Sequence, residues 1–119
     1  MNQLIEDAEF TLFDTETTGL DPASGDRIVE LAGVRVKGKT KLAEFQALVN
    51  PGREISPAAF AVNKITPAML KGAPDIAEVL PGFLKFIEGS CLCSYNAGFD
   101  LEFLDNELKL SNMDELKGI

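Results

Sequence analysis

The sequence predicts an α/β domain in which an antiparallel three-strand meander is followed by a helix–strand–helix unit. Two observations carry this prediction: β-forming residues gather in three segments before residue 50, and apolar residues recur at a helical spacing after it. At 119 residues, the chain is long enough for one hydrophobic core and one domain. We therefore expect a single mixed sheet with helices packed on it.

Three successive segments carry the signals of strands. The first, residues 9–14, leads into a turn that contains Thr and Gly. The second spans residues 27–36, and Lys37-Gly38-Lys39-Thr40 then supplies the residue types of a hairpin turn. The third covers about 41–49 and stops at Asn50-Pro51-Gly52. Strands joined by such short connections form a meander.

Helical signals begin after the third strand. Ser56-Pro57 and Thr66-Pro67 each place an N-cap residue before a proline that suits the first helical position. Residues 74–88 carry an apolar stripe at the helical period. Within this stripe, Pro81 should kink or split the helix, and Gly89 should end it.

The last two predicted elements are a short buried strand at residues 91–95 and an amphipathic helix from Gly98 to about Leu110. Cys91 and Cys93 occupy alternate positions of that strand, about 6.6 Å apart, which is poor geometry for a disulfide. A zinc site would need further Cys or His ligands, and the chain has no histidine. We expect buried, reduced thiols.

Composition bounds the possible partners. A formal net charge of −8 argues against a nucleic-acid protein, because phosphate binding normally needs a basic surface. Divalent cations held by carboxylates would reverse the local sign of the charge. No apolar run reaches the length of a membrane span, and residues 1–7 lack the basic start of a secretory signal. We therefore expect a cytoplasmic protein without a membrane partner.

The most informative segment is Asp14-Thr15-Glu16-Thr17-Thr18-Gly19, at the end of the first predicted strand. Side chains alternate along a strand, so Asp14 and Glu16 should lie on the same face. Neighbouring carboxylates repel each other, and a divalent cation such as Mg²⁺ or Mn²⁺ relieves the repulsion. Gly19 lets the backbone turn sharply. Taken alone, however, two solvated carboxylates at a sheet edge are the commoner explanation.

A second polar segment, Asn96-Ala97-Gly98-Phe99-Asp100, follows the predicted fourth strand. Asn96 fits an N-cap, which places Asp100 in the first turn of the last helix. A carboxylate there gains from the helix dipole even without a function. Phe99, considered alone, is more typical of a core residue.

Together, the two segments resemble the first and second motifs of the DEDD exonuclease superfamily: Asp-x-Glu-Thr-Thr-Gly and Asn-Ala-x-Phe-Asp. Residues 65–70, followed by Pro74, are similar to the Ile-Thr-x-x-Met-Leu…Pro segment of its DnaQ-like branch, which includes DNA polymerase III epsilon and PolC-type exonuclease domains. The similarity runs from about residue 10 to residue 108. It implies an RNase H-like fold.

The resemblance also implies an activity, namely 3′→5′ hydrolysis of nucleic acid with release of nucleoside 5′-monophosphates. It implies that Asp14, Glu16 and Asp100 are the catalytic residues and hold two Mg²⁺ or Mn²⁺ ions. The implied partners are the 3′ ends of single-stranded DNA or RNA and a DNA polymerase subunit. The implied substrate-binding residues are Thr15, Thr17, Thr18, Gly19, Leu20, Asn63, Ile65, Asn96 and Phe99.

The sequence also departs from that family. The family's third motif is His-x-Ala-x-x-Asp or Tyr-x-x-x-Asp, but the chain has no His, and its one Tyr, Tyr95, precedes Asp100. Asn63-Lys64 stands where the family commonly has His-Gly. We therefore expect residues 1–119 to form a single partial exonuclease domain with little activity, whose exposed apolar surface favours self-association. The alternative is a catalytically dead module that binds nucleic acid or a polymerase partner.

Overall fold

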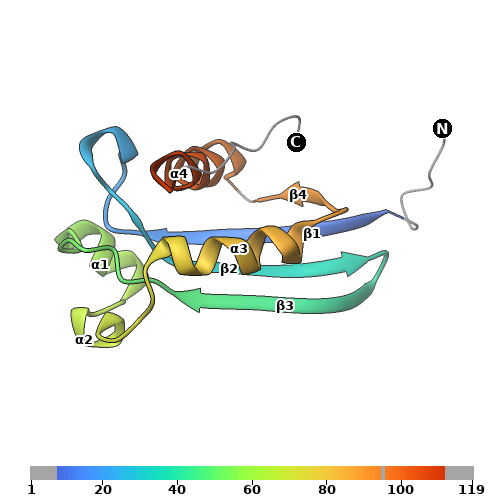
Figure 1. Ribbon diagram of the computed structural model, residues 1–119, viewed down its shortest axis with the longest axis horizontal. Coiled ribbons are helices and arrows are strands. Elements are labelled where there is room, and N and C mark those ends of the chain that lie inside the picture. The colour runs from blue at the N-terminus through green and yellow to red at the C-terminus, as the bar shows by residue number, and fades with distance from the viewer. Residues whose placement is uncertain (1–7, 95, 112–119) are drawn as a thin grey trace.

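Four strands form one mixed sheet in the order β3-β2-β1-β4 in this computed structural model, which describes residues 8–94 and 96–111 (Figure 1). The strands are β1 Glu9–Thr17, β2 Ile28–Lys37, β3 Thr40–Leu48 and β4 Cys91–Cys93. The first three pair antiparallel, as a meander should, whereas β4 pairs parallel to β1. The predicted mixed sheet is confirmed.

Strand β1 is three residues longer than the sequence predicts. Its antiparallel pairing with β2 continues through Glu16↔Glu30 to Thr17↔Ile28, with an irregularity between Glu16 and Thr17. The Thr-rich segment that suggested a turn is therefore still strand, because β2 supplies backbone partners and threonine is a good strand former. The consequence is that Asp14 and Glu16 both belong to β1, as their predicted alternation requires.

In the described residues, the helical elements are the 3-10 turn η2 Pro22–Ser24 between β1 and β2, α1 Pro57–Asn63, α2 Pro67–Leu70 and α3 Ile76–Ile87 between β3 and β4, and α4 Ala97–Leu110 after β4. The two predicted N-caps are confirmed. The Ser56 side chain accepts from Ala59 N, and the Thr66 side chain accepts from Met69 N. Among the described residues, no helix is both long and apolar enough to cross a bilayer.

Helix α3 is not split at Pro81, so that part of the prediction is wrong. The proline lies inside a helix assigned without interruption from Ile76 to Ile87. Proline removes one i→i−4 hydrogen bond, while Leu80 and Phe83 on either side of it are fully buried. Packing of this apolar stripe therefore outweighs the loss of one bond. Gly89 follows the helix with φ +79°, which confirms that it ends there.

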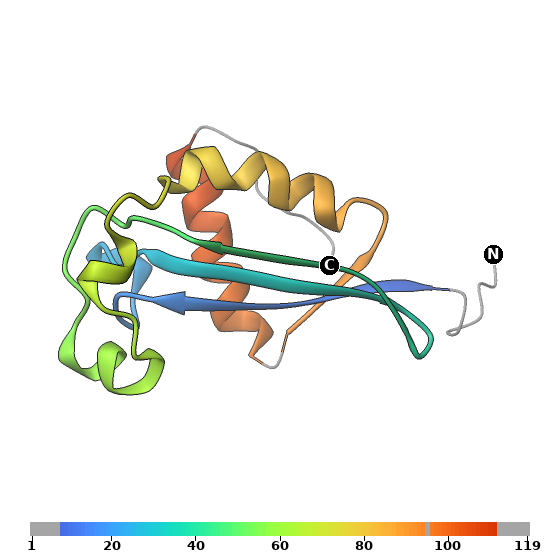
Figure 2. The ribbon, with the colours of Figure 1, turned by 90° about the horizontal axis from the view of Figure 1, so that it is seen from below.

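Helices α3 and α4 share one core with the sheet (Figure 2). Phe13 of β1 packs against Phe83 of α3 with ring centroids 6.1 Å apart, and Leu31 of β2 joins the same cluster. Leu104 and Leu108 complete it from α4 and are fully buried. Alternation along β1 leaves Leu12 on the other face, where it is half exposed.

The predicted burial of β4 is wrong. Cys91 is exposed and Cys93 is half-buried, although both are free thiols as expected. Only three residues of β4 pair, with Phe10 to Leu12 of β1. A short strand at the edge of a sheet is covered on fewer sides than a central one. Tyr95, the last residue of the predicted strand, lies outside the described residues.

Candidate active site

The site forms where the parallel strands β1 and β4 end. Strand β4 pairs only with Phe10–Leu12, and after Cys93 the chain turns away into α4. Beyond Leu12, the edge of β1 that faced β4 therefore lies beside the first turn of α4. This brings Thr15 within hydrogen-bond distance of Asp100. Ligands of open α/β sheets commonly bind outside the carboxyl ends of parallel strands.

Two of the three predicted acids come from β1. Asp14 is exposed and Glu16 is half-buried, while Thr15 between them is buried on the helix-covered face. The strand alternation expected from the sequence is confirmed. Burial and, next, the Asp100 carboxylate raise the pKa of Asp14, and burial followed by the charges of Asp14, Glu30 and Asp100 raises the pKa of Glu16. Burial is the larger cause of both shifts, and the neighbouring carboxylates add to it because like charges disfavour the ionised form.

The third acid, Asp100, is 3% exposed and lies in the first turn of α4, as predicted. Both of its carboxylate oxygens accept hydrogen bonds from hydroxyl groups. Thr15 Oγ1 donates to Oδ1 at 2.5 Å, and Ser94 Oγ donates to Oδ2. Asn96 occupies the N-cap position but makes no side-chain capping bond. Asp100 is therefore held by β1 and by the loop after β4, not by the cap.

The chemistry of these donors suits a hard divalent cation, because oxygen ligands from carboxylates are what Mg²⁺ and Mn²⁺ prefer. A cation would also relieve the repulsion that raises the pKa of Asp14 and of Glu16. Within residues 8–94 and 96–111, no group of three or more His, Cys, Asp and Glu side chains is arranged to hold a metal ion. Asp14, Glu16 and Asp100 are oxygen donors close enough for their charges to interact, but they do not form a ready ligand set.

A cleft of about 680 Å³ opens beside these acids. Its walls come from β1, the loop after β1, α1 and the start of α4. Of the predicted site residues, the cleft is lined by Asp14, Thr15, Glu16, Thr17, Gly19, Leu20, Asn63, Asn96, Phe99 and Asp100. Asp21 and Asp26 add two further acids, and the described residues contribute no Lys or Arg to the lining.

Two predicted substrate-binding residues do not line the cleft. Thr18 is fully buried behind it, where its hydroxyl donates to Asp26 and accepts from Arg27 N. Ile65 is buried in a small apolar cluster with Val29 and Leu70. The resemblance to the exonuclease family implied contact with a substrate, but both side chains are buried.

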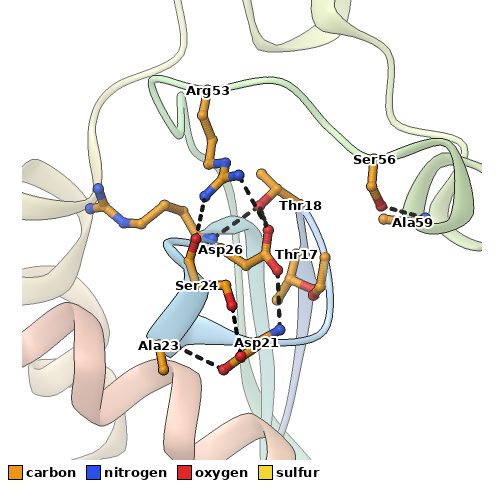
Figure 3. Close-up of polar contacts among 11 residues, drawn as sticks. Thr17, Thr18, Asp21, Ala23, Ser24, Asp26, Arg53, Ser56 and Ala59 are labelled. Carbon is orange, nitrogen blue, oxygen red and sulfur yellow. Dashed lines mark hydrogen bonds and ion pairs between the residues drawn. The ribbon is translucent and has the colours of Figure 1, made fainter.

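The loop from β1 to β2 is ordered around the Asp26 carboxylate (Figure 3). Asp26 accepts from Thr18 Oγ1 at 2.9 Å and from Asp21 N at 3.1 Å, and Arg53 lies 3.8 Å away. A Cβ on Gly19 would meet the same carboxylate at 2.4 Å, so the glycine is required by close approach rather than by its backbone angles. This loop presents Leu20, 82% exposed, at the cleft.

Across the cleft, Asn63 ties α1 to the end of β1. Its Nδ2 donates to Thr17 O at 3.2 Å, and its Oδ1 accepts from Ile65 N at 2.9 Å. Asn63 therefore uses one side-chain donor and one acceptor in hydrogen bonds to the backbone, and it also lines the cleft. The next residue, Lys64, has φ +58°, a left-handed conformation that glycine adopts more easily.

Sequence reasoning missed three features of the site. Val62 lines the cleft at 81% exposure, because α1 buries none of its side chains. Ser94 bonds to Asp100. Glu107, 1% exposed, holds Arg27 through an ion pair of 2.6 Å between Oε1 and Arg27 Nη2. The signal for the last pair was the position of Glu107 on the apolar stripe of α4, four residues after Phe103 and next to Leu108.

A second hollow, of about 950 Å³, lies on the sheet face opposite the core. Leu12, Val34 and Gln46 line it, and Asp14 reaches its rim. It is larger than the cleft, but Asp14 is the only one of the three predicted acids on its lining. The grouping of Asp14, Glu16 and Asp100 therefore favours the cleft as the functional site.

Solved structures of exonuclease I share this architecture. One, bound to an inhibitor, superposes with a TM-score of 0.83 at 22% identity, covering 93% of this chain and 26% of that chain. Another, of the Escherichia coli enzyme with a dT13 oligonucleotide, gives 0.82. The mixed sheet with its carboxylate-lined cleft thus defines an α/β domain of the RNase H-like fold.

Sequence comparison identifies the family. The sequence model of the exonuclease family matches residues 11–117, so the chain belongs to that family, and its relatives place it in the DnaQ-like group. A DNA polymerase III subunit epsilon-like protein of Rhodobacter capsulatus is 55% identical over 97 residues, which are 80% of this chain and 14% of the relative. The DNA polymerase III subunit epsilon of Treponema pallidum is 43% identical over 111 residues, covering 93% of this chain and 51% of the relative. The chain thus spans about half of one relative and a small part of the other.

Proposed function

We propose that this domain belongs to a metal-dependent 3′→5′ exonuclease that removes nucleotides from the 3′ end of single-stranded DNA or RNA. The observation that carries the proposal is the grouping of Asp14, Glu16 and Asp100 at one cleft in a chain of the exonuclease family. Exonuclease I, which has the same fold, is solved with an oligonucleotide. The names of the relatives support a DNA polymerase as partner and a cytoplasmic location.

In this proposal, the three carboxylates hold two Mg²⁺ or Mn²⁺ ions. Bound there, the ions would polarise the scissile phosphate and lower the pKa of an attacking water. The residues of the chain do the remaining work. Asp14 and Glu16 present oxygens from a rigid strand, and Asp100 presents a third carboxylate that Thr15 holds by a hydrogen bond.

The cleft walls suit a nucleotide at the end of a strand. Leu20 and Val62 expose apolar side chains from the two sides of the cleft, where a base would bury them. Phe99 also lines the cleft and packs on Phe103, with ring centroids 4.9 Å apart. These side chains would give the terminal base apolar contacts that do not depend on which of the four bases it is.

No histidine is present to act as the general base. General-base catalysis contributes about 10²–10⁴-fold, so hydrolysis by this chain should be slower by that order than hydrolysis by relatives that have such a histidine. A 5′-labelled single-stranded oligonucleotide, incubated with Mn²⁺, should give a slow ladder of products shortened from the 3′ end. Blocking the 3′ end with phosphorothioate linkages should stop the ladder.

The control is the variant Asp14→Asn, which keeps the side-chain shape and should produce no ladder. Products that arise equally with Asp14→Asn would mean a contaminating nuclease and no support for the site. If the wild-type chain binds the oligonucleotide but never shortens it, even at high enzyme concentration, the result favours the module that binds without catalysis.

A further inference from the structure

We propose that the hydroxyl of Ser94, together with that of Thr15, is a positioning device that orients the Asp100 carboxylate for cation binding. The inference rests on the proposed function, since it concerns the same cleft. Neither hydroxyl is itself proposed as a ligand. Ser94 is a positioning residue that acts through Asp100.

The geometry places one hydroxyl donor on each carboxylate oxygen. Thr15 Oγ1 donates to Asp100 Oδ1 at 2.5 Å, and Ser94 Oγ donates to Asp100 Oδ2. A carboxylate fixed at both oxygens cannot rotate about its terminal bond without losing a hydrogen bond. Each oxygen has two lone pairs, so each keeps one for a cation after accepting one hydroxyl.

The two donors approach from different elements, so the orientation is defined by the tertiary structure. Thr15 is buried on β1 between the two other acids, whereas Ser94 is the first residue after β4. Ser94 Oγ also accepts from Asn96 N at 3.3 Å, which fixes the hydroxyl itself at the turn into α4. The hydroxyl therefore has one donor bond to give, and it is directed at Asp100.

Such outer partners have a measurable effect in known metal sites. Hydrogen bonds that orient a ligand change metal affinity by about 10- to 100-fold when they are removed. Asp100 is nearly fully buried, so water has little access to replace a lost hydroxyl. We expect Ser94→Ala to raise the Kd for Mn²⁺ by about tenfold.

The test measures Mn²⁺ binding directly, by the loss of the free-ion signal in electron paramagnetic resonance, on the chain as it stands. Ser94→Ala should weaken binding, and Ser94→Thr should restore it, because threonine keeps the hydroxyl and Ser94 borders an open hollow with space for a methyl group. Thr15→Val should weaken binding to a similar degree without changing the loop after β4. Thermal unfolding of each variant verifies that it is folded.

Ser90→Ala is the matched control. Ser90 flanks the opposite end of β4, and its hydroxyl also makes two hydrogen bonds, to Thr11 and to Ile87 O. It should leave Mn²⁺ binding unchanged. An equal loss of Mn²⁺ affinity in Ser90→Ala and Ser94→Ala would overturn the inference. A loss of affinity in Ser94→Ala but not in Thr15→Val would also overturn it, because the effect would then come from the turn after β4 and not from the Asp100 carboxylate.

Asp100→Asn separates the inference from the proposed function. If Asp100→Asn leaves Mn²⁺ affinity unchanged, the proposed metal site is wrong and the role of Ser94 fails with it. If Asp100→Asn weakens binding while Ser94→Ala does not, the metal site stands and only the positioning role of Ser94 is overturned.

Discussion

Replacing Glu107 with alanine should destabilise the fold more than any other single change on the exposed or polar positions of α4. Its carboxylate accepts from Arg27 Nε with both oxygens, at 2.8 and 3.0 Å, and from Ile28 N at 3.0 Å. These bonds join α4 to the first residues of β2. They also raise the pKa of Arg27, chiefly through the side-chain hydrogen bond to Glu107.

The magnitude follows from what the substitution leaves behind. The Ile28 amide would remain buried without its partner, which costs about 1–3 kcal/mol. Breaking a fully buried ion pair costs about 3–5 kcal/mol, but the Arg27 side chain is 28% exposed and can recover part of its hydration. We therefore expect a loss of about 3 kcal/mol in the free energy of unfolding, a large fraction of the stability of an ordinary domain.

Urea denaturation followed by circular dichroism measures this loss. With a slope of about 1.5 kcal/mol per molar, the midpoint should fall by about 2 M. Glu102→Ala, at an exposed position of the same helix, is the matched control and should change stability by less than about 0.5 kcal/mol. In a double-mutant cycle, Glu107→Ala and Arg27→Ala should couple by more than about 1 kcal/mol. A midpoint shift no larger than that of Glu102→Ala would refute the reasoning.

Three further predictions concern stability and pH. Asp14→Asn should stabilise the metal-free protein at pH 7 by up to about 1 kcal/mol, since solvent screens this exposed group. A raised pKa means that the charged form opposes folding, so the gain should disappear as the pH falls below the ordinary aspartate value; a gain that persists at pH 3 would contradict this. Gly19→Ala should lower the free energy of unfolding by about 1–3 kcal/mol, because its Cβ would meet Asp26. Gly98→Ala, whose Cβ would meet no atom within 4 Å, should raise it by about 0.5–1 kcal/mol. Equal effects of the two substitutions in urea denaturation would refute the contrast. Lys64→Gly should raise the thermal midpoint, because glycine adopts φ +58° without strain, with a net gain in the free energy of unfolding of about 0.5–1 kcal/mol. A lower midpoint would contradict this and would show that the lysine side chain stabilises the fold by more than the strain.

Most of the fold was predictable because local signals and tertiary structure agree. The hairpin turn at Lys37–Thr40 and the caps at Ser56 and Thr66 occur where their residue types predict them. Each of these signals depends on a few neighbouring residues. Pro81 shows the limit, because its local preference is overridden by buried neighbours that the sequence does not place in space.

The site was predictable only as far as its motifs reach. Alternation along one strand predicted that Asp14 and Glu16 share a face, and capping chemistry predicted that Asp100 lies in the first turn of α4. The partner of Asp100 across the structure was not predictable. In the sequence, Ser94 is one residue of the predicted fourth strand and Glu107 is an acid on the apolar stripe of the last helix, and neither has an evident partner until the fold supplies it.

The parallel pairing of β1 with β4 has a consequence for the order in which this protein folds. Phe10 pairs with Cys91, and the bond between Thr15 and Asp100 closes a loop of 85 residues. Closing a loop of that length costs about 4 kcal/mol of chain entropy, and contacts of large sequence separation form slowly. The meander of β1, β2 and β3 involves short connections and can form earlier.

Competence to bind a cation should therefore return last in a refolding experiment. Stopped-flow circular dichroism should recover the strand signal before Mn²⁺ binding reappears. A molecule in which only the hairpins have formed has Asp14 and Glu16 in place but lacks Asp100 beside them. Cation binding would therefore indicate that β4 and α4 have docked on the meander.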